Sequence, residues 1–395
     1  MWQQAKNIYH LLVAWFASWY YAFPGRGMTV IGVTGTDGKT TTASLIFHIL
    51  RENGIHAALI STVGATIGTK QYGTGFHVTT PGSAQMQSYL KQARDTGTTH
   101  VVLEVTSHAL DQNRTVGIPF SIGLITNISH EHLDYHKTYE KYVEAKTKLL
   151  HVAKIGIVNK DDKSCPIIRK LVPDKRLFTY GKADADYTLD MVKSFKNNLI
   201  GKYNLYNILA ATAVCLNLGI QKDAIAKAVV TFRLPKGRTE IVYDGEFRVM
   251  IDFAHTPNAF THLLSTLKKT KHGRIIHVFG AAGRRDASKR PLMGEVASEY
   301  DDVIVLTAED PRNEPVQKII DEIASGIISV GTVPEVHTIR DRQEAISFAL
   351  SLARKGDIVA ITGKGHEESM NLGKGETPWS DHEAVTKALQ TRYEK

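Results

Sequence analysis

The chain has 395 residues, of which 43% are hydrophobic and 22% are charged, values typical of a globular protein with a sizeable core. This length exceeds one average domain and suits two. The two cysteines, Cys165 and Cys215, are far apart, which argues against a disulfide framework or a cysteine-built zinc site and fits a reducing compartment. The net charge of +8 comes from scattered Lys and Arg residues, so we expect anionic small substrates and no nucleic acid.

The N-terminal segment, residues 1–27, contains an apolar stretch rich in Trp and Tyr, IYHLLVAWFASWYYAF (8–23). This stretch is shorter than the roughly 20 residues that a membrane span needs. It also lacks a clear small-residue cleavage site of a signal peptide. We expect a helix docked on the first domain. The alternative is peripheral membrane contact through 8–23, because Trp and Tyr suit a membrane interface.

Short apolar, β-branched runs alternate with helical patterns after this segment. The predicted strands are 28–34, 57–62, 100–105, 122–127 and 155–159. The clearest helical patterns are 40–52, 83–96 and 138–150. Such alternation predicts an α/β domain over 28–234, with a mostly parallel sheet covered on both faces.

A second series of strands follows a break rich in Pro, Gly and Arg, RLPKGRTE (233–240). Its predicted strands are 247–252, 274–280, 302–307 and 357–363. Helical stretches again separate the strands. We therefore expect a second, Rossmann-like α/β domain over 235–395.

A glycine-rich loop, GTDGKT (35–40), lies between the first strand and the first helix. It is a shortened Walker pattern, because only two residues separate Gly35 from Gly38. Backbone N–H groups of such a loop and of the helix N-terminus hold phosphate oxygens. In this context Lys39 is expected to reach the β- and γ-phosphates, and the Thr40 hydroxyl to bind Mg²⁺. The alternative is an ordinary strand–helix turn.

Polar residues also follow two other predicted strands. Glu104 ends a buried strand, where a carboxylate is costly without a partner, and a metal ion is a suitable partner. The stretch NISHEHLDYH (127–136) follows another strand. Because ligands bind at the carboxyl ends of parallel strands, these residues are candidates for the same site. Lys146, on a predicted helix, would by itself be interpreted as a surface lysine.

These motifs resemble those of the Mur ligases, and specifically the MurE type, which adds the third residue of the peptidoglycan stem peptide. The similarity runs from about residue 28 to the C-terminus. It is carried by GTDGKTTT (35–42), TTPGS (79–83), EVTSHALDQNR (104–114), TNISHEHLDYH (126–136), EAK (144–146), YNLYN (203–207), GRTE (237–240), DFAHTPNA (252–259), FGAAGRRDASKRP (279–291), EDPR (309–312) and GKGHE (363–367).

The resemblance implies an ATP-dependent carboxylate–amine ligase. In that family ATP phosphorylates a substrate carboxylate, and an amino acid's amine then attacks the acyl phosphate to form an amide. The implied substrates are UDP-N-acetylmuramoyl-L-Ala-D-Glu and a diamino acid, either diaminopimelate or lysine. The implied cofactors are ATP and two Mg²⁺ ions, which would neutralise the repelling anions. We expect a cytoplasmic monomer.

The resemblance also implies the role of each site residue. Catalytic roles fall to Lys39, His132 and Lys146, and Lys146 would carry a CO₂-derived carbamate. The implied metal ligands are Thr40, Glu104, His132 and Lys146. The implied nucleotide contacts are Gly35, Thr36, Asp37, Gly38, Lys39, Thr40, Thr41, Asn204, Asn207, Arg238 and Asp252. The nucleotide-sugar peptide would meet Thr79, Thr80, Thr106, Gln112 and Arg114. The incoming amino acid would meet Arg285, Glu309, Asp310, Arg312, Gly363 and Glu367.

The chain departs from the family pattern at several points. Residues 1–27 are too short to be the N-terminal domain that grips the uridine diphosphate in the family. Asp37 stands where Asn is usual, and Thr106 where Ser is usual. The loop GAAGRRD carries Ala282 and Arg284 in place of the usual residues.

The amino-acid loop also departs from the pattern. It reads Glu-Asp-Pro-Arg (309–312), where diaminopimelate-adding enzymes have Asp-Asn-Pro-Arg. Arg312 is kept, which favours a diamino acid with a distal carboxylate. The acidity of Asp310 instead favours lysine.

Two rival functions remain. A folylpolyglutamate-synthase-like ligase, which adds glutamate, also lacks the uridine-binding domain, although TTPGS and GKGHE argue against it. A non-enzymatic nucleotide-binding scaffold, tethered to a membrane by 8–23, would have no need of Lys39, Glu104, His132 and Lys146 together. Glutamate-dependent ATP turnover with pterin binding would favour the first rival, and amino-acid-dependent ATP hydrolysis would exclude the second.

Overall fold

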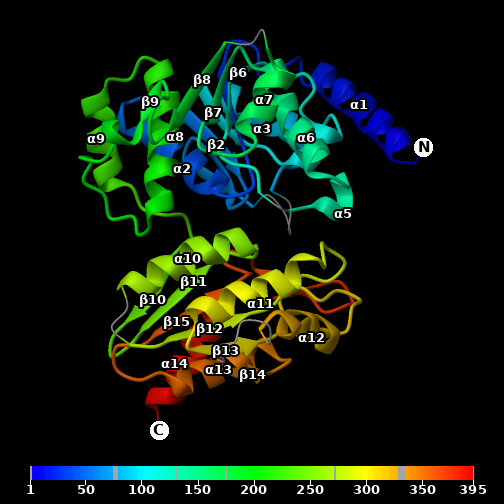
Figure 1. Ribbon diagram of the computed structural model, residues 1–395. Helices are drawn as coiled ribbons and strands as arrows, with labels where there is room; N and C mark the ends of the chain where they lie inside the picture. The colour runs from blue at the N-terminus through cyan, green and yellow to red at the C-terminus, as the bar shows by residue number, and fades with distance from the viewer. Residues whose placement is uncertain are drawn as a thin grey trace. The chain divides into compact units, whose positions relative to one another are not determined.

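The computed structural model describes residues 2–73, 79–129, 131–173, 176–270, 273–327 and 334–394. The chain divides into two compact units, Met1–Arg233 and Leu234–Lys395. Each unit is built from a mostly parallel sheet and helices (Figure 1). The predicted α/β fold class is therefore confirmed, and the two units are described separately below.

The sheet of the first unit has, among the described residues, the strand order β4-β3-β2-β5-β1-β6-β7-β8-β9. Its strands are β1 (Thr29–Thr34), β2 (Ala57–Ser61), β3 (Gly64–Ile67), β4 (Lys70–Tyr72), β5 (His100–Glu104), β6 (Phe120–Ile125), β7 (Ile155–Asn159), β8 (Leu177–Gly181) and β9 (Tyr187–Thr188). β3 and β4 pair antiparallel with their neighbours, and the other pairs are parallel.

Strand β1 occupies the middle of this sheet and positions the candidate site. Every residue from Val30 to Thr34 is buried. Because side chains alternate between the two faces of a strand, this pattern requires cover on both faces. Val33 is in register with Glu104 of β5 and Leu124 of β6, so three strands end side by side.

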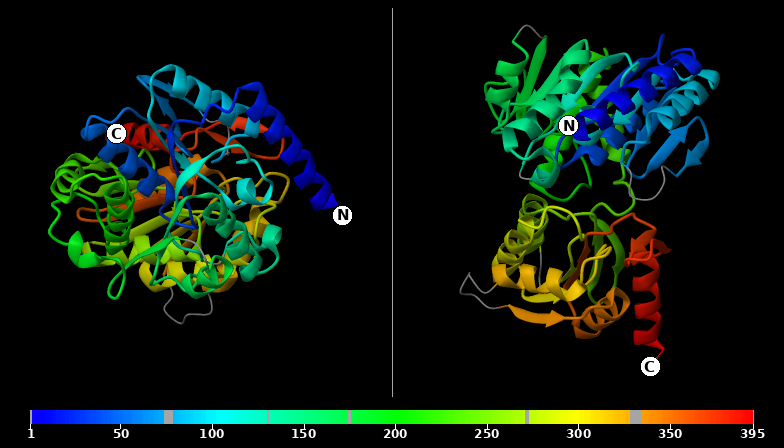
Figure 2. Two further views of the ribbon diagram at one scale, coloured as in Figure 1. Left: turned by 90° about the horizontal axis from the view of Figure 1, so that it is seen from above. Right: turned by 90° about the vertical axis from the view of Figure 1, so that its right-hand side faces the viewer.

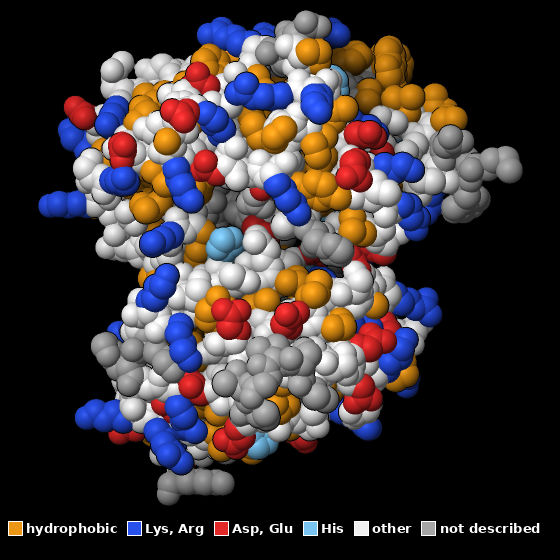
Figure 3. Space-filling model, viewed as in Figure 1, with side chains coloured by type: hydrophobic (Ala, Val, Ile, Leu, Met, Phe, Trp, Pro, Cys, Tyr) orange, Lys and Arg blue, Asp and Glu red, His pale blue; other side chains and the backbone are white. Residues whose placement is uncertain are grey.

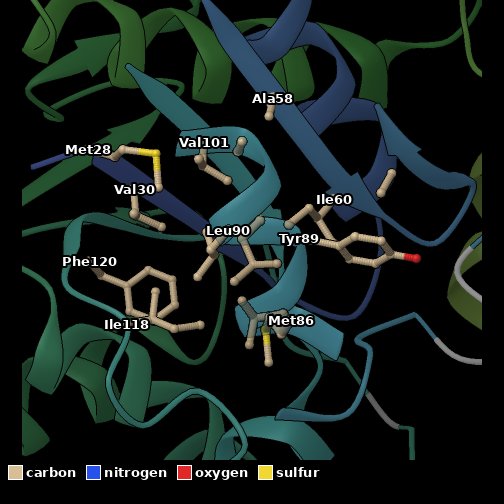
Figure 4. Packing of buried hydrophobic residues seen from close by; sticks show 14 of the residues in the cluster. Met28, Val30, Ala58, Ile60, Met86, Tyr89, Leu90, Val101, Ile118 and Phe120 are labelled. Atoms are coloured by element: carbon tan, nitrogen blue, oxygen red, sulfur yellow. The ribbon is translucent and has the colours of Figure 1, made fainter. Parts of the chain in front are cut away.

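The helices of the first unit connect these strands. They are α1 (Trp2–Tyr20), α2 (Lys39–Glu52), α3 (Ser83–Asp95), α4 (Ser107–Asp111), α5 (Leu133–His136), α6 (Tyr139–Val152), α7 (Cys165–Leu171), the 3₁₀ helix η1 (Leu189–Met191), α8 (Lys202–Asn217) and α9 (Lys222–Thr231). On one face of the sheet, Met86 and Leu90 of α3 belong to one buried apolar cluster with Val30 and Val101 (Figure 4). Burying a side chain of this size contributes about 1.5–3 kcal/mol.

The second unit has, within its described residues, a sheet in the order β10-β11-β15-β12-β13-β14 and a small β16-β17 ribbon. Its strands are β10 (Glu240–Asp244), β11 (Arg248–Asp252), β12 (Ile275–Phe279), β13 (Val303–Leu306), β14 (Glu335–Thr338), β15 (Ile358–Thr362), β16 (Ser369–Asn371) and β17 (Glu376–Pro378). Its helices are α10 (Pro257–Thr270), α11 (Lys289–Tyr300), α12 (Val316–Ile327), α13 (Arg342–Leu352) and α14 (Asp381–Tyr393). Apart from β10, the strands of the larger sheet run parallel.

The predicted strands are all present, but several observed strands were not identified from the sequence. These are β3, β4, β8, β9, β10, β14, β16 and β17. Most are short and lie towards the edges of their sheets, with partly exposed residues. An edge strand needs no continuous apolar run, so the pattern used for buried strands misses it.

The predicted N-terminal helix is present as α1 and begins earlier than residue 8. It packs on α3, as Figure 2 shows in its right-hand view. Gln87 of α3 donates a hydrogen bond to the Ser18 hydroxyl at 2.9 Å, and this hydroxyl donates to the carbonyl of Val116 at 3.1 Å. The expected docking on the first unit is therefore confirmed.

Candidate active site

The glycine-rich loop of residues 35–40, called the phosphate-type loop below, follows β1 directly and runs into the first turn of α2. Gly38 has a φ of +77°, a conformation in which most side chains are strained. A Cβ atom at Gly38 would lie 2.4 Å from Oδ1 of Asn207, and one at Gly35 would lie 1.8 Å from Oγ1 of Thr126. The loop therefore tolerates only glycine at both positions.

Two residues that follow β6 hold this loop in place. Thr126 Oγ1 and Asn127 Nδ2 donate to the carbonyl of Asp37 at 2.7 and 2.9 Å. The Asp37 amide donates to Oδ1 of Asn127 at 3.0 Å, and the Thr36 amide donates to the Asn127 carbonyl at 2.8 Å. The loop is thus ordered by the protein itself, and the N-terminal amides of α2 remain oriented for an anion. Sequence reasoning missed Thr126 and Asn127 as individual residues, although both lie in the TNISHEH motif.

Thr40 and Glu104 meet at the ends of neighbouring elements. Thr40 Oγ1 donates to Oε1 of Glu104 at 3.2 Å, and the Thr62 amide donates to Oε2 at 3.0 Å. The side chains of Thr40 and Glu104 are both buried. A hydroxyl and a carboxylate are the hard oxygen ligands that Mg²⁺ prefers.

No group of three or more His, Cys, Asp and Glu side chains is placed to hold a metal ion in the part of the chain that the structure describes. Nucleotide-bound Mg²⁺ takes only one or two protein carboxylates, besides water and phosphate oxygens. Thr40 and Glu104 therefore fit such an ion without a larger cluster.

Lys146 of α6 is buried beneath the loop. Its ammonium donates to the Gly35 carbonyl at 2.6 Å and lies 4.6 Å from the centre of the Tyr142 ring. Burial, helped by the nearby Lys39, holds the Lys146 pKa well below its usual value. The lowered pKa favours the neutral, nucleophilic form of this amine. Lys39 itself donates to the Thr36 carbonyl at 2.8 Å.

Three histidines of two motifs gather beside this lysine. His132 has a φ of +56° and precedes α5. Its ring makes an edge contact with His108, with 4.9 Å between the ring centres. His136 shares a 3.0 Å hydrogen bond with Ser107, and burial and His108 lower its pKa to about 4. His136 is thus neutral at pH 7, and His130 lies outside the described residues.

The predicted contacts to the nucleotide-sugar peptide lie together next to Glu104. Thr80 Oγ1 donates to the Glu104 carbonyl at 3.2 Å and accepts from the Thr106 amide at 2.9 Å. Thr79, the preceding residue, is half-buried. The Thr106 hydroxyl also accepts from the Ala109 amide and so caps α4. The side chains of Thr80 and Thr106 are therefore held in place by the backbone around them.

Gln112 and Arg114 complete this group. The Arg114 guanidinium donates to Oε1 of Gln112 at 2.5 Å, and Gln112 donates to the Tyr135 hydroxyl at 3.3 Å. Tyr135 donates in turn to Asp111 at 2.9 Å, and burial raises its pKa to about 12. Sequence reasoning did not single out Tyr135, which lies within a quoted motif.

The predicted nucleotide contacts lie on both units. In the first unit, Asn207 Nδ2 donates to Oδ1 of Asn204 at 2.9 Å, and Thr42 of α2 donates to Oδ1 of Asn207 at 3.2 Å. The neighbouring Thr41 is buried. The two asparagines of α8 therefore adjoin the glycine loop.

In the second unit, Arg238 and Asp252 are neighbours. The Arg238 guanidinium lies 4.5 Å over the Phe253 ring. Asp252 accepts from the amides of Thr239 and Ala254 at 2.5 and 2.6 Å. Burial raises the Asp252 pKa, and the charge of Arg238 opposes this effect. The structure thus places an arginine and a carboxylate side by side at the end of β11.

Four of the residues predicted to meet the amino acid lie around a lysine that was not predicted, namely Glu309, Asp310, Gly363 and Glu367. Lys364 is fully buried, and its ammonium lies 3.2 Å from Oδ1 of Asp310 and 2.6 Å from Oε2 of Glu367. Gly363 has a φ of +103°, and a Cβ there would lie 3.0 Å from Cδ of Glu309. The lysine belongs to the quoted GKGHE motif, but nothing in the sequence showed that it would be buried between two carboxylates.

Two arginines of this predicted set lie on the loops that follow β12 and β13. Arg285 is exposed and Arg312 is half-exposed. Arg312 has a φ of +54°, and its amide donates to the Asn371 carbonyl at 2.8 Å. The two arginines are thus less buried than Glu309 and Asp310 of the same set.

The burial of Glu309 can be tested by measuring how the stability of the protein depends on pH. Burial raises the pKa of Glu309 from an ordinary 4.5 to about 7, although Lys289 and Lys364 favour the charged form. The folded chain therefore binds this proton more tightly than the unfolded chain, and the unfolding free energy falls as the pH rises from about 4.5 to about 7. Replacing Glu309 with glutamine should remove this fall, which is on the order of 3 kcal/mol.

Thermal midpoints between pH 4.5 and pH 8 measure this effect. We expect the wild type to lose stability over this range relative to Glu309→Gln. Glu295→Gln, at an exposed position of the same unit, is the control and should follow the wild type. A parallel pH dependence of Glu309→Gln and wild type would contradict the raised pKa.

The architecture and the loop define a nucleotide-binding α/β class, and comparison with known proteins identifies the family. The Mur ligase middle domain matches residues 33–215, and the Mur ligase, glutamate ligase domain matches residues 237–365. A UDP-N-acetylmuramoyl-L-alanyl-D-glutamate–2,6-diaminopimelate ligase of Aquifex aeolicus is 40% identical over 388 residues, which cover 94% of this chain and 79% of that protein. The chain belongs to the Mur ligase family, and it is a ligase.

Solved structures agree with this assignment. The structure of a UDP-N-acetylmuramoyl-L-alanyl-D-glutamate–2,6-diaminopimelate ligase has a TM-score of 0.61 and 31% identity, over 93% of this chain and 79% of that one. A folylpolyglutamate synthase of Mycobacterium tuberculosis complexed with ADP has a TM-score of 0.70 at 17% identity, over 89% of this chain and 91% of that one. The second likeness shows a shared fold only, so it does not support the folylpolyglutamate rival.

Proposed function

We propose that this chain is an ATP-dependent ligase that joins diaminopimelate to the glutamate carboxylate of UDP-N-acetylmuramoyl-L-Ala-D-Glu. One observation supports this proposal above the others. Lys146 is fully buried, with its amine 2.6 Å from the carbonyl of Gly35 in the phosphate-type loop. A structural lysine has little reason to bear this desolvation cost, whereas a carbamate-forming lysine requires it. The substrates are those named for the similar proteins.

The residues of the first unit would bind and align two anions. ATP would supply the phosphoryl group, and Mg²⁺ would offset the charge between that group and the acceptor carboxylate. Thr40 and Glu104 would hold one ion, and His132 and the carbamate of Lys146 would hold a second. Lys39 would turn from the Thr36 carbonyl to the phosphates.

The amide bond then forms between two positioned groups. Thr80, Thr106 and Gln112, with Thr79 and Arg114, would orient the acceptor so that its glutamate carboxylate faces the transferred phosphoryl group. The diamino acid would enter through the residues around Lys364, where Arg312 would pair with its distal carboxylate in a bidentate contact. Its amine would attack the acyl phosphate, and inorganic phosphate would leave.

We also propose a cytoplasmic monomer that acts on small molecules and not on nucleic acid. The proposed substrates, ATP and a nucleotide sugar, occur in the cytoplasm. The two cysteines are buried and form no disulfide, which suits the reducing conditions of that compartment. Among the described residues, no helix has both the length and the hydropathy of a bilayer-spanning helix.

Phosphate release from ATP tests this function. The assay contains UDP-N-acetylmuramoyl-L-Ala-D-Glu and, in separate reactions, diaminopimelate, lysine or glutamate. We expect release that requires both the nucleotide-sugar dipeptide and diaminopimelate. Turnover with a folate and glutamate, or with a different peptide acceptor, would retain the chemistry and overturn the acceptor.

Asp310 provides a test of amino-acid choice. Its carboxylate is paired with Lys364 and accepts from the Asn371 amide at 2.9 Å, so its charge is already compensated within the protein. Lys364 would keep its pairing with Glu367 in Asp310→Asn. We therefore expect this variant to keep diaminopimelate as substrate, with a KM changed by less than about fivefold.

The contrast for this test is Arg312→Met, whose KM for diaminopimelate we expect to rise roughly 100-fold, because a charged pairing is lost. Steady-state kinetics with diaminopimelate and lysine measure both variants. A change of preferred amino acid between the wild type and Asp310→Asn would show that Asp310 selects the substrate directly.

A further inference from the structure

Helix α1 turns its smallest side chains towards the protein. Ala14, Ala17 and Ser18 are buried, and the Ser18 hydroxyl donates to the carbonyls of Ala14 and Val116 at 2.7 and 3.1 Å. A Cβ at Gly117 would lie 2.1 Å from this hydroxyl, so the helix approaches the chain there as closely as glycine permits. These contacts fix the rotation of α1 about its own axis.

The opposite side of α1, which we call the outer face, carries large apolar side chains. It comprises Ile8, Tyr9, Leu12, Trp15, Phe16, Trp19 and Tyr20, whose exposed fractions lie between 58% and 68%. Apolar side chains gather over α1 at the upper right of Figure 3. An amphipathic helix normally buries such residues, and a large exposed apolar surface marks an interaction site.

The N-terminal segment that carries the outer face has charges of one sign only. The first 36 residues contain no Asp or Glu, whereas Lys6, His10 and Arg26 are basic or can become so. The Arg26 guanidinium lies 4.1 Å over the Phe23 ring, at the C-terminal end of the helix. Burial together with Arg114 and Lys6 lowers the pKa of His10, as expected in positive surroundings.

This combination selects one kind of partner. Aliphatic and Phe side chains favour acyl chains, Trp and Tyr favour the level of the headgroups, and basic residues favour acidic headgroups. A second copy of the chain fits less well. A symmetric pairing would bring Lys6 and Arg26 of both copies to one seam, and this segment offers no acid to pair with them.

We propose that the outer face of α1 docks on the surface of a bilayer rich in acidic phospholipid, with the helix lying in the plane of the interface. The N-terminal half of the helix also contacts residues next to the candidate acceptor site. Gln3 donates to the Tyr135 hydroxyl at 2.7 Å, and Asn7 donates to Asp111 at 3.4 Å. Docking would therefore bring Gln112, the neighbour of Tyr135, close to the membrane surface. This inference depends on α1 alone and not on the proposed reaction.

Flotation of the full chain with vesicles tests the proposal. One set of vesicles contains phosphatidylglycerol with phosphatidylcholine, and the other contains phosphatidylcholine alone. We expect binding to the acidic vesicles, with a blue shift of tryptophan emission. The triple variant Trp15→Ser, Phe16→Ser, Trp19→Ser should bind at least about 20-fold more weakly. The control Val152→Ser, Val230→Ser changes apolar side chains that are 59% and 43% exposed elsewhere on the first unit, and should bind as the wild type does.

A second variant separates the electrostatic contribution from folding effects. Lys6→Gln, Arg26→Gln leaves the apolar face intact and should lose most of the preference for acidic vesicles, as should the wild type at high salt. Thermal midpoints of all variants verify that each is folded. Three results would overturn the proposal: no binding of wild type to either vesicle, equal binding by the triple variant, or a lipid-independent dimer that the triple variant dissociates. The last result would assign the outer face to a second copy.

Discussion

Replacing Lys146 with alanine is expected to lower ligation turnover by roughly 10³-fold. The side chain is buried, its amine donates to the Gly35 carbonyl, and its pKa lies well below the usual value. A carbamate there would add a negative oxygen ligand beside Glu104 and His132. Alanine removes that ligand and leaves a void beneath the phosphate-type loop. Phosphate release that depends on both the acceptor and the amino acid measures the effect.

Two controls distinguish a carbamate from a purely structural role. Lys141→Ala changes an exposed lysine of the same helix and should leave turnover unchanged. Added bicarbonate should not restore Lys146→Ala, whereas short carboxylic acids should restore part of its activity, because they can occupy the place of the carbamate. Near-normal turnover of Lys146→Ala would show that the carbamate hypothesis is wrong.

Replacing Gly38 with alanine should weaken nucleotide binding by roughly 100-fold. The residue has a φ of +77°, and a Cβ would lie 2.4 Å from Oδ1 of Asn207, which also accepts a hydrogen bond from Thr42. The loop would have to move away from α8, and its amides would no longer point at the phosphates. Calorimetric titration with a non-hydrolysable ATP analogue measures the loss.

Gly54 provides a matched control at the other end of the same helix. Its φ is +72°, but a Cβ there would meet nothing within 4 Å. Gly54→Ala should therefore cost about 1–2 kcal/mol of stability through backbone strain and leave nucleotide affinity unchanged. Equal loss of affinity in Gly38→Ala and Gly54→Ala would show that strain, and not the clash with Asn207, governs the loop.

Sequence patterns predicted the buried central strands, because each is a continuous apolar, β-branched run. β1 is buried at five of its six positions, and β12 at all five. The predicted parallel sheet also placed Glu104 and Thr40 in one site. Each residue follows or ends a strand, and the carboxyl ends of parallel strands meet at one edge of the sheet. The 3.2 Å contact between their side chains agrees with this expectation.

The contacts that the sequence did not reveal are those between segments distant in the chain. Thr126 and Asn127 hold the loop at Asp37, some 90 residues earlier, through hydrogen bonds that no local pattern encodes. Lys364 pairs with Asp310, and this pairing compensates the acid that, in the sequence, left lysine open as an alternative to diaminopimelate. Lysine and aspartate usually lie on the protein surface, so the sequence gives no sign that these two residues are buried as an ion pair.

By itself, the sequence determined the α/β class, the place of the phosphate-type loop and the family. Periodicity, glycine positions and the order of motifs can all be recognised along the chain without knowledge of its packing. Only the tertiary structure decided how the side chains are used. It buried Lys146 under the loop and so shifted its pKa, and it turned the small residues of α1 inward and the large aromatic ones outward. Desolvation and the orientation of a helix depend on what packs against it, and that information is distributed over the whole fold.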